Sequence, residues 1–357
     1  MVPYHMSLYS QAQSFCPSSV LITLLTNHRM PPPLISLPPE LLCDILRKLP
    51  IEEGRNLLLS CREIYDNGKH AFDQKCFRVI PLTLEHESMS QAEDLTKKQP
   101  CCFLEEIIIR IDRECDRHPG KLHLEDRLLS LFTNALQVST KFDTITIQYD
   151  PEEFDSPVGR YRAHTKAVVW AIKTFLKGHE STDLKIDIQN IRLHDCATLF
   201  ALGKSFLNRV HSIGLRFEPY DTTVRSIQEL LPLATNLKEI SLMNDTGETL
   251  TSNPIRKVMK AVNSKTLESI SLAGVDTTKD KLQEILHPLK ASLKNIKLQQ
   301  MTFEQKSFES FVRYISRDYS LEDFDLEDIW ETDGKKEHEV IDPMSYWYDL
   351  QPTPASS

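Results

Sequence analysis

Glycine is scarce in this chain, with 10 residues among 357, and no glycine-rich loop of the kind that cradles phosphate groups is present. The His-Glu-x-x-His pair of zinc proteases and the Gly-x-Ser-x-Gly elbow of serine hydrolases are missing too. No apolar run approaches the roughly 20 residues that a helix needs to span a bilayer. The sequence therefore contains none of these enzyme motifs and no segment that predicts a transmembrane helix.

Positive charge is also in short supply, because 42 lysines and arginines face 51 aspartates and glutamates, for a net charge of −9. The basic residues are interspersed with acids, whereas contacts to nucleic-acid phosphates need clustered lysine and arginine. The composition therefore argues against nucleic-acid binding and fits a partner protein with a basic surface better.

Cysteine is too sparse for a disulfide-stapled domain, with eight residues spread over the first two thirds of the chain. We expect reduced thiols and a location in the cytoplasm or nucleus. One loose group of zinc-type ligands, Cys102, Cys115, His118 and His123, has no Cys-x-x-Cys pair and matches no usual finger spacing. We therefore expect no metal and no cofactor.

The most informative stretch runs from Leu34 to Pro50. Two prolines suit the first turn of a helix, and the acid that follows them, Glu40, favours the positive helix end. Apolar residues then recur at steps of three and four until Pro50 closes the run. We predict three short helices, at about 38–48, 52–61 and 62–75, in a domain of residues 34–76. This domain buries too little surface to be stable alone and needs a partner protein, the following domain, or both.

The order Leu-Pro-Pro-Glu-Leu-Leu from Leu37 to Leu42 and the Ile-Leu-x-x-Leu-Pro that follows are succeeded by a Leu-rich turn, by Ser60-Cys61-Arg62 and by an aromatic residue, Tyr65. Together these features resemble an F-box of the kind found in many fungal proteins. The resemblance implies docking to the Skp adaptor and, through it, to the cullin of an SCF ubiquitin ligase. The implied adaptor-binding residues are Leu37, Pro38, Leu41, Leu42, Ile45, Leu46, Leu49, Pro50, Leu57, Leu59 and Cys61.

The sequence departs from the family at Gly54 and Arg55, which stand where two apolar residues usually follow an acid. We expect the second helix to start late or to pack loosely there. The alternative interpretation of 37–49 is an ordinary amphipathic helix that caps the following domain.

The segment before these helices, residues 1–33, combines Ser, Gln and Pro, which predicts disorder. Met30 offers an alternative start of the working protein.

A short unit recurs behind the helices: an apolar residue, two variable ones, an apolar one, one variable and another apolar one. The copies begin at Phe77, Leu104, Phe142, Val210, Leu237, Leu267, Leu293 and Leu321, and a ninth, from Leu184, starts one residue late. Each copy alternates like a strand. Helical patterns follow most of them, at 127–136, 161–175, 197–207, 224–233, 255–262, 281–289 and 308–315.

The later copies lie 26 to 30 residues apart, which is the period of leucine-rich repeats. We therefore predict that residues 77–330 form an α/β solenoid with a parallel sheet, with an insertion at Asp150–Gly159. The asparagine usual in such repeats is replaced by Asp245, Val275, Met301 and Ile329, so the repeats are degenerate. The alternative is a generic α/β domain with a mostly parallel sheet.

The variable strand positions of a solenoid point to its concave face, because side chains alternate along a strand. Polar residues dominate there, and the sign of the charge changes along the array, which suits a protein ligand. The candidate target-binding residues are Arg216, Met243, Lys297, Gln299, Asp325 and Glu327. The alternative is that most of them are merely solvated.

The tail at 331–357 keeps no repeat and mixes acids with aromatic residues. We interpret it as a cap on the last strand, followed by disorder after Asp349; a short peptide motif for a partner is the alternative.

These patterns favour a non-enzymatic substrate receptor, with the Skp adaptor, cullin and an unknown target protein as partners, and without nucleic-acid or membrane binding. A scaffold acting without a ligase is the second hypothesis. The third is a hydrolase or metalloenzyme built on residues 101–160.

Overall fold

A computed structural model describes residues 37–97, 102–111, 123–150, 161–180, 182–193, 196, 203–217, 224–244, 250–333, 337–340 and 343–348. The segment predicted as disordered, 1–33, and residues 151–159 of the predicted insertion lie outside the described residues. The chain divides into two compact units between Cys76 and Phe77, the boundary that the sequence suggests.

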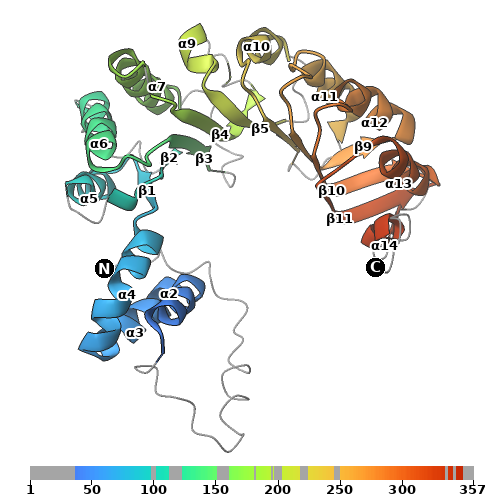
Figure 1. The fold of residues 1–357 in the computed structure, drawn as a ribbon. Helices are drawn as coiled ribbons and strands as arrows, with labels where there is room; N and C mark the ends of the chain where they lie inside the picture. Colours follow the sequence, from blue (N-terminus) through green and yellow to red (C-terminus); the bar gives the residue numbers. More distant parts are fainter. Residues whose placement is uncertain are drawn as a thin grey trace, which may run out of the picture. The chain divides into compact units, whose positions relative to one another are not determined.

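Three helices make up the first unit: α2 (Pro39–Lys48), α3 (Ile51–Ser60) and α4 (Arg62–Cys76) (Figure 1). Helix α2 has proline in its first turn, where the missing N–H costs nothing, and carries Glu40 at its start and Lys48 at its end. These charges interact favourably with the helix dipole, and proline is well tolerated in the first turn. The three helices begin and end within one residue of the predicted bounds.

The expectation of a late or loose second helix is wrong. Helix α3 begins at Ile51, directly after Pro50, and Gly54 is buried inside it. A Cβ atom added at Gly54 would lie 3.0 Å from Cε2 of Phe72, so this glycine allows α3 to lie close against α4. Gly68 of α4 has the matching role, because an added Cβ would overlap Cδ1 of Leu46.

The core of this unit is small and contains Leu42, Leu46, Leu58 and Ile64. The C-terminus of α2 is fixed to α4 by Lys75, whose ammonium group donates hydrogen bonds to the carbonyl oxygens of Arg47, at 2.9 Å, and of Leu49. Such a contact satisfies carbonyl groups that a helix end leaves without partners.

The second unit is built on a sheet whose strands follow one another in the order of the sequence. The path runs β1 (Val79–Thr83), β2 (Glu106–Ile111), β3 (Thr144–Tyr149), β4 (Lys185–Arg192), β5 (Val210–Arg216), β6 (Glu239–Met243), β8 (Ser269–Ala273), β10 (Asn295–Glu304), β11 (Asp323–Thr332) and β12 (Glu337–Glu339). The short strands β7 (Leu250–Thr251) and β9 (Val275–Thr277) pair with each other, and β9 also pairs with β10. All of these pairs are parallel except β11 with β12.

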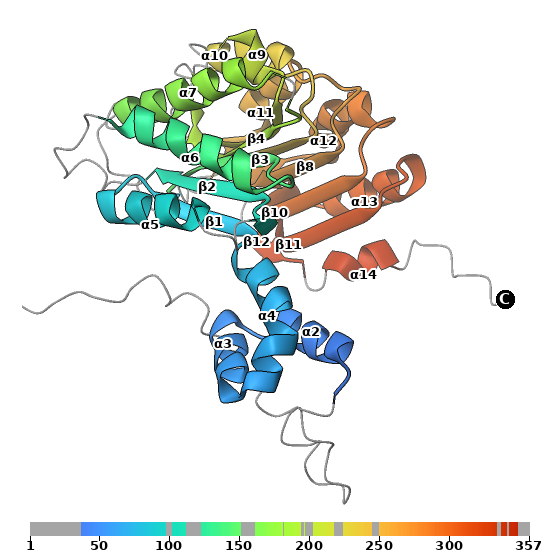
Figure 2. The same cartoon turned by 60° about the vertical axis from the view of Figure 1, so that its left-hand side comes forward.

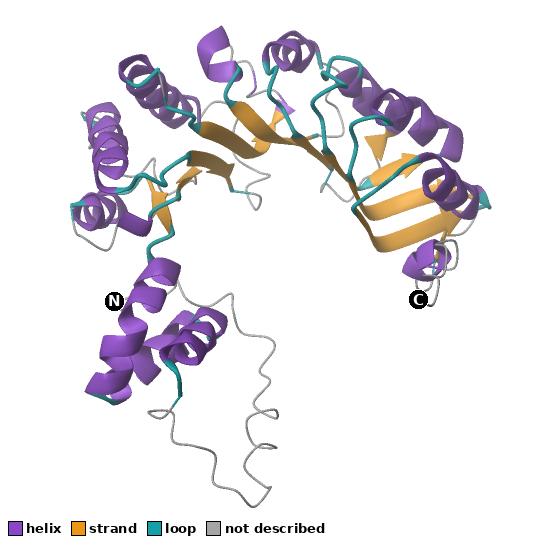
Figure 3. Cartoon of the chain, in the orientation of Figure 1, coloured by secondary structure: helices purple, strands orange, loops and turns teal. Residues whose placement is uncertain are grey.

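Helices return the chain between strands and lie along one face of the sheet, the outer side of the arc (Figures 1 and 3). They are α5 (His86–Thr96), α6 (Leu124–Val138), α7 (Tyr161–Gly178), α9 (Lys204–Leu207), α10 (Arg225–Leu230), α11 (Ser252–Met259), α12 (Lys279–Leu286) and α13 (Ser307–Asp318), with the 3-10 turns Leu231–Leu233 and His287–Leu289. The turned view shows α5, α6 and α7 side by side over the first strands (Figure 2).

This arrangement is the α/β solenoid that the repeat spacing predicts. Successive strands are neighbours, and the helices occupy one face instead of the two faces of a doubly wound sheet. Sequence analysis missed helix α5, because its buried residues, Met89, Ala92 and Thr96, form no leucine-rich pattern.

Three of the positions without the usual asparagine turn out to be core positions. Val275, Met301 and Ile329 are buried. Each comes directly after a residue with a positive φ, namely Gly274 (70°), Gln300 (50°) and Asp328 (52°). The residue with positive φ bends the strand, so the apolar side chain after it points into the core. In usual leucine-rich repeats an asparagine occupies this position instead.

Strand β4 carries a similar bulge, because Asn190 has a φ of 60° and the register to β5 shifts between Ile188 and Ile191. A Cβ atom added at Gly214 would lie 3.1 Å from the backbone nitrogen of Asn190, so glycine permits this close approach.

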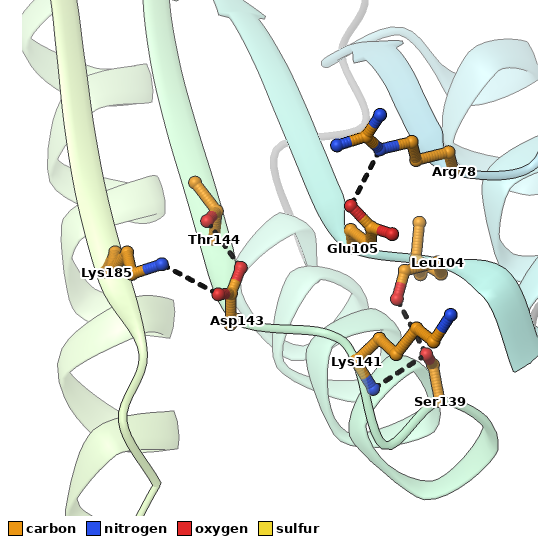
Figure 4. A network of polar contacts seen from close by, with 8 residues as sticks. All are labelled: Arg78, Leu104, Glu105, Ser139, Lys141, Asp143, Thr144 and Lys185. Atoms are coloured by element: carbon orange, nitrogen blue, oxygen red, sulfur yellow. Dashed lines mark hydrogen bonds and ion pairs between the residues drawn. The ribbon is translucent and has the colours of Figure 1, made fainter.

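Polar contacts join neighbouring repeats just before their strands begin (Figure 4). Nε of Arg78 lies 2.6 Å from Oε2 of Glu105, and Nζ of Lys185 lies 2.8 Å from Oδ2 of Asp143. The hydroxyl group of Ser139, which is buried, donates to the carbonyl oxygen of Leu104 at 2.6 Å. Each contact links residues 27 to 42 positions apart in sequence, so it fixes one repeat to the next.

The last long strand is partly covered. Strand β12 pairs antiparallel with residues 330–332 of β11. Helix α14 (Pro343–Tyr348) brings Trp347 to Phe324 of β11, with ring centroids 4.6 Å apart. A covered edge strand is a poorer template for pairing with another chain. Within the described ranges no helix is long and apolar enough to cross a bilayer.

Candidate functional site

Apolar side chains remain exposed on the three-helix unit although its own core is small. Leu41, Ile51 and Leu59 are 50%, 44% and 67% exposed, and Tyr65 is 38% exposed. Exposed leucine and isoleucine on a unit of some forty residues leave apolar area in water that a partner can bury. We call these four residues the exposed apolar set.

The predicted adaptor-binding residues fall into three groups. Pro38, Leu41, Pro50 and Leu59 are exposed; Leu37, Ile45, Leu49, Leu57 and Cys61 are half-buried; Leu42 and Leu46 are buried. The last pair corrects the prediction, because both side chains pack inside the three-helix core and present no surface for docking. Their recurrence at four-residue spacing signals a buried stripe, and sequence alone does not say which partner buries it.

Two members of the exposed apolar set, Ile51 and Tyr65, were missed as site residues. Ile51 falls on α3 only because this helix starts directly after Pro50. The predicted helix, at about 52–61, left Ile51 one residue outside its bounds. Tyr65 was noted only as an aromatic of the motif; in the structure the ammonium group of Lys69 lies 5.4 Å from its ring centroid.

The second candidate surface is the strand face opposite the helices. Its polar residues alternate with buried ones along strands such as β11, where Phe324 and Leu326 are buried and Asp323 and Glu327 are exposed. In the register, Lys297 of β10 lies between Ser271 of β8 and Asp325 of β11. The predicted alternation of core and open face therefore describes these strands.

Four of the predicted target-binding residues form one polar cluster on β10 and β11. Nζ of Lys297 lies 3.0 Å from Oδ2 of Asp325 and 3.9 Å from Oε2 of Glu327. The side-chain amide of Gln299 donates a hydrogen bond to Glu327. The hydrogen bond to Asp325 raises the pKa of Lys297 above its ordinary value, and the charges of Asp325, Glu327 and Asp323 raise it further.

Arg216 does not belong to this open face, which corrects the prediction. It is 3% exposed, and its guanidinium group reaches the carbonyl oxygen of Asp150 at 3.5 Å. Residues 213–217 of β5 and its end are all buried, so the simple alternation fails in this strand. Met243, its register partner on β6, is half-buried.

The open face also carries a carboxyl group with a raised pKa, Asp187, which could not be identified from the sequence. Burial raises the pKa of Asp187 to about 6; the charges of Glu106 and Glu239 add to the effect, while His211 and the N–H of Ser212 oppose it. One carboxyl oxygen of Asp187 is buried and has no hydrogen-bond partner among the residues that the structure describes. Buried, like-charged neighbours disfavour the ionised form.

We expect Asp187→Asn to stabilise the protein in a pH-dependent way. Because the folded pKa is raised, wild-type stability falls as the pH rises from about 4 to about 6, and the loss persists above that range. The variant should gain up to about 3 kcal/mol at pH 7.5 and nothing at pH 3.5. Urea denaturation at the two pH values measures the difference. An equal gain at both would contradict the prediction, and exposed Asp183→Asn serves as the control.

In the described part of the chain, no group of three or more His, Cys, Asp or Glu residues is arranged to hold a metal ion. Cys115 and His118 of the loose zinc-type group lie outside the described residues. Cys43, Cys61, Cys76 and Cys102 are free thiols, and burial raises the pKa of Cys76.

Comparison with known proteins gives only distant structural similarity. No protein-family model matches the chain, and no curated protein matches it. Among solved structures, the leucine-rich repeat-containing protein LegL7 from Legionella pneumophila is 9% identical, covers 85% of this chain and 87% of its own, and has a TM-score of 0.43.

Two sugar epimerase structures are also similar. A D-tagatose 3-epimerase-like protein is 10% identical over 66% of this chain and 96% of its own, with a TM-score of 0.24. D-psicose 3-epimerase is 12% identical over 76% and 88%, also with a TM-score of 0.24. Similarities of this size carry no argument, so the fold description rests on strand order and helix placement: the second unit is an α/β solenoid with a mostly parallel sheet.

Proposed function

We propose that this protein is an F-box substrate receptor of an SCF ubiquitin ligase. Its three-helix unit docks to the Skp adaptor, its repeat unit binds a target protein, and a separate conjugating enzyme on the cullin transfers ubiquitin. The receptor itself is not catalytic. It acts by raising the local concentration of target lysines near the charged thioester.

One observation carries the proposal: some leucines of the three-helix unit pack into its own core, whereas others are exposed. Leu42 and Leu46 are buried, whereas Leu41, in the same helix, is half exposed, as is Ile51 at the start of α3. The segment that contains them is the one that resembles an F-box. A small helical unit with unburied apolar area is more stable with a partner seated on it.

The repeat unit supports the second half of the proposal. An α/β solenoid presents a long row of strand positions on one face, and such arrays commonly serve as extended binding surfaces. Here that face carries polar residues of both charges, from Asp187 on β4 to Glu327 on β11. This composition fits a protein ligand better than a small apolar molecule.

The proposal is tested by replacing exposed apolar residues of the three-helix unit. We expect Leu41→Asp with Leu59→Asp to lower co-purification of the full chain with Skp adaptor by at least about tenfold, because two buried apolar contacts are lost and two charges must be desolvated. The variant should stay folded, since neither side chain belongs to the core. Circular dichroism monitors folding.

Exposed polar positions on the same helices provide the control. Lys48→Asp with Asn56→Asp introduces two aspartates into α2 and α3 and should leave adaptor binding within about twofold. Failure of the wild-type chain to bind adaptor, or equal binding by all variants, would exclude the receptor function.

A scaffold acting without a ligase is the second candidate, because the solenoid forms a compact unit of its own. It predicts adaptor binding that is absent, or that is present without any change in target ubiquitylation. Reconstituted ubiquitylation of a captured target, with and without the receptor, separates the two functions.

A further inference from the structure

The strand face of β10 and β11 carries several carboxylates close together. Four carboxylates, Asp323, Asp325, Glu327 and Asp328, stand on or beside this face of β11. Lys297 is the one basic residue on the corresponding face of β10 within the described strand, and it lies against Asp325 at 3.0 Å. The face therefore carries an excess of negative charge, although Lys297 neutralises part of it.

An exposed aromatic ring completes this face. Trp330 of β11 is 36% exposed and pairs in register with Thr302 of β10. Its neighbours in the strand, Ile329 and Glu331, are turned toward the helices: Ile329 is buried, and Glu331 accepts a hydrogen bond from the N–H of Phe308 in α13 at 3.0 Å. The indole thus lies on the same side of the sheet as the carboxylates.

The strands next to this charged edge offer room for an extended segment. The register row that includes Lys297 contains Ser241 on β6 and Ser271 on β8, and in the next row on this face Ala273 lies between Met243 and Gln299. Small side chains at these positions keep the floor of the face low, so that a bound backbone can lie close to the sheet while its side chains reach β11.

We propose that the open face of β10 and β11 binds an extended, arginine-rich segment of the target protein, with guanidinium groups at the carboxylates and against the indole of Trp330. This inference names the class of target and rests on the proposed receptor function.

Arginine suits both parts of this face. Its planar guanidinium group pairs with carboxylates in a fork and stacks on aromatic rings, whereas lysine acts as a single point charge. Exposed carboxylates and an exposed indole each contribute modestly, so affinity depends on several contacts made together. Tryptophan is also enriched among binding hot spots.

The clean charge-removing variant is Asp323→Asn with Asp328→Asn. Neither residue takes part in the two ion pairs that Lys297 makes, with Asp325 and with Glu327. Asn accepts the positive φ of 52° at position 328 at least as well as Asp does. Trp330→Ala removes the ring separately.

The probe is a fluorescein-labelled peptide of four Arg-Ala repeats, followed by fluorescence anisotropy with the full chain in low salt. We expect wild type to bind it at least about fivefold more tightly than the Asp323→Asn, Asp328→Asn variant and about threefold more tightly than Trp330→Ala. Raising the salt from about 50 to 300 mM should weaken binding further, since exposed charges are screened. A Glu-Ala peptide should not bind.

The matched control is Glu125→Gln with Asp280→Asn, which removes two exposed charges from the first turns of α6 and α12 on the helix side. It should bind the arginine peptide as wild type does. The inference is overturned if wild type does not bind the peptide, if the β11 variants bind it as tightly as wild type, or if the control loses as much affinity.

Adaptor binding, measured on the same preparations, separates this inference from the proposed function. Adaptor binding without peptide binding overturns only the inference about the target. Peptide binding without adaptor binding supports the acidic face and removes the ligase role.

Discussion

We expect Gly274→Ala to destabilise the repeat unit by about 2 to 4 kcal/mol, one of the largest single-residue effects in this protein. Gly274 has a φ of 70°, and a Cβ atom added there would overlap the carbonyl oxygen of Asn244. The side-chain amide of Asn244, in turn, donates to the carbonyl oxygen of Gly274 at 3.1 Å. The substitution therefore combines backbone strain with a clash against neighbouring backbone, which cannot move aside as a side chain can.

Gly203→Ala separates the two costs. Gly203 also has a positive φ, of 77°, but no atom of the described part of the chain lies within 4 Å of an added Cβ. Only the strain of about 1 kcal/mol should appear there. Urea denaturation followed by circular dichroism measures both variants. Equal losses at the two glycines would show that the contact with Asn244 is unimportant.

We expect Leu46→Ala to unfold the three-helix unit or bring it close to unfolding. Leu46 is fully buried, and truncating a buried leucine costs about 2 to 5 kcal/mol. A unit of some forty residues has little stability to lose. The variant should lose hydrogen-exchange protection throughout α2, α3 and α4, while the repeat unit keeps its own.

Leu59→Ala is the matched comparison, because this leucine is 67% exposed. It should cost less than about 0.5 kcal/mol and leave the exchange of all three helices unchanged. Similar exchange in the two variants would mean that the core assigned to this unit is wrong.

The fold could largely be predicted from the sequence, because its two periodic signals are strong. Apolar residues at three- and four-residue steps place α2 within one residue, and the 26- to 30-residue repeat predicts a parallel solenoid. Helix α5 was not predicted, because buried residues such as Ala92 and Thr96 give no clear hydrophobic periodicity. Gly54 was misread as a weakness, because the sequence does not show that Phe72 lies against it.

The candidate sites were less predictable, because burial depends on contacts between segments far apart in the sequence. A leucine stripe does not show which members face the unit's own core, so Leu42 and Leu41 looked equivalent. The alternation of side chains along β5 predicts that Arg216 faces the open side of the sheet. In the structure, however, residues 213–217 at the end of this strand are all buried. Asp187 looks like any polar strand residue until Glu106 and Glu239 are placed beside it.

Hydrogen exchange of the full chain with and without purified Skp adaptor tests the central claim most directly. The account predicts added protection in α2 and α3, the helices that carry Leu41, Ile51 and Leu59, with the strands of the repeat unit unchanged. Adaptor that leaves exchange unchanged everywhere, or that protects the repeat unit instead of the three helices, would contradict it.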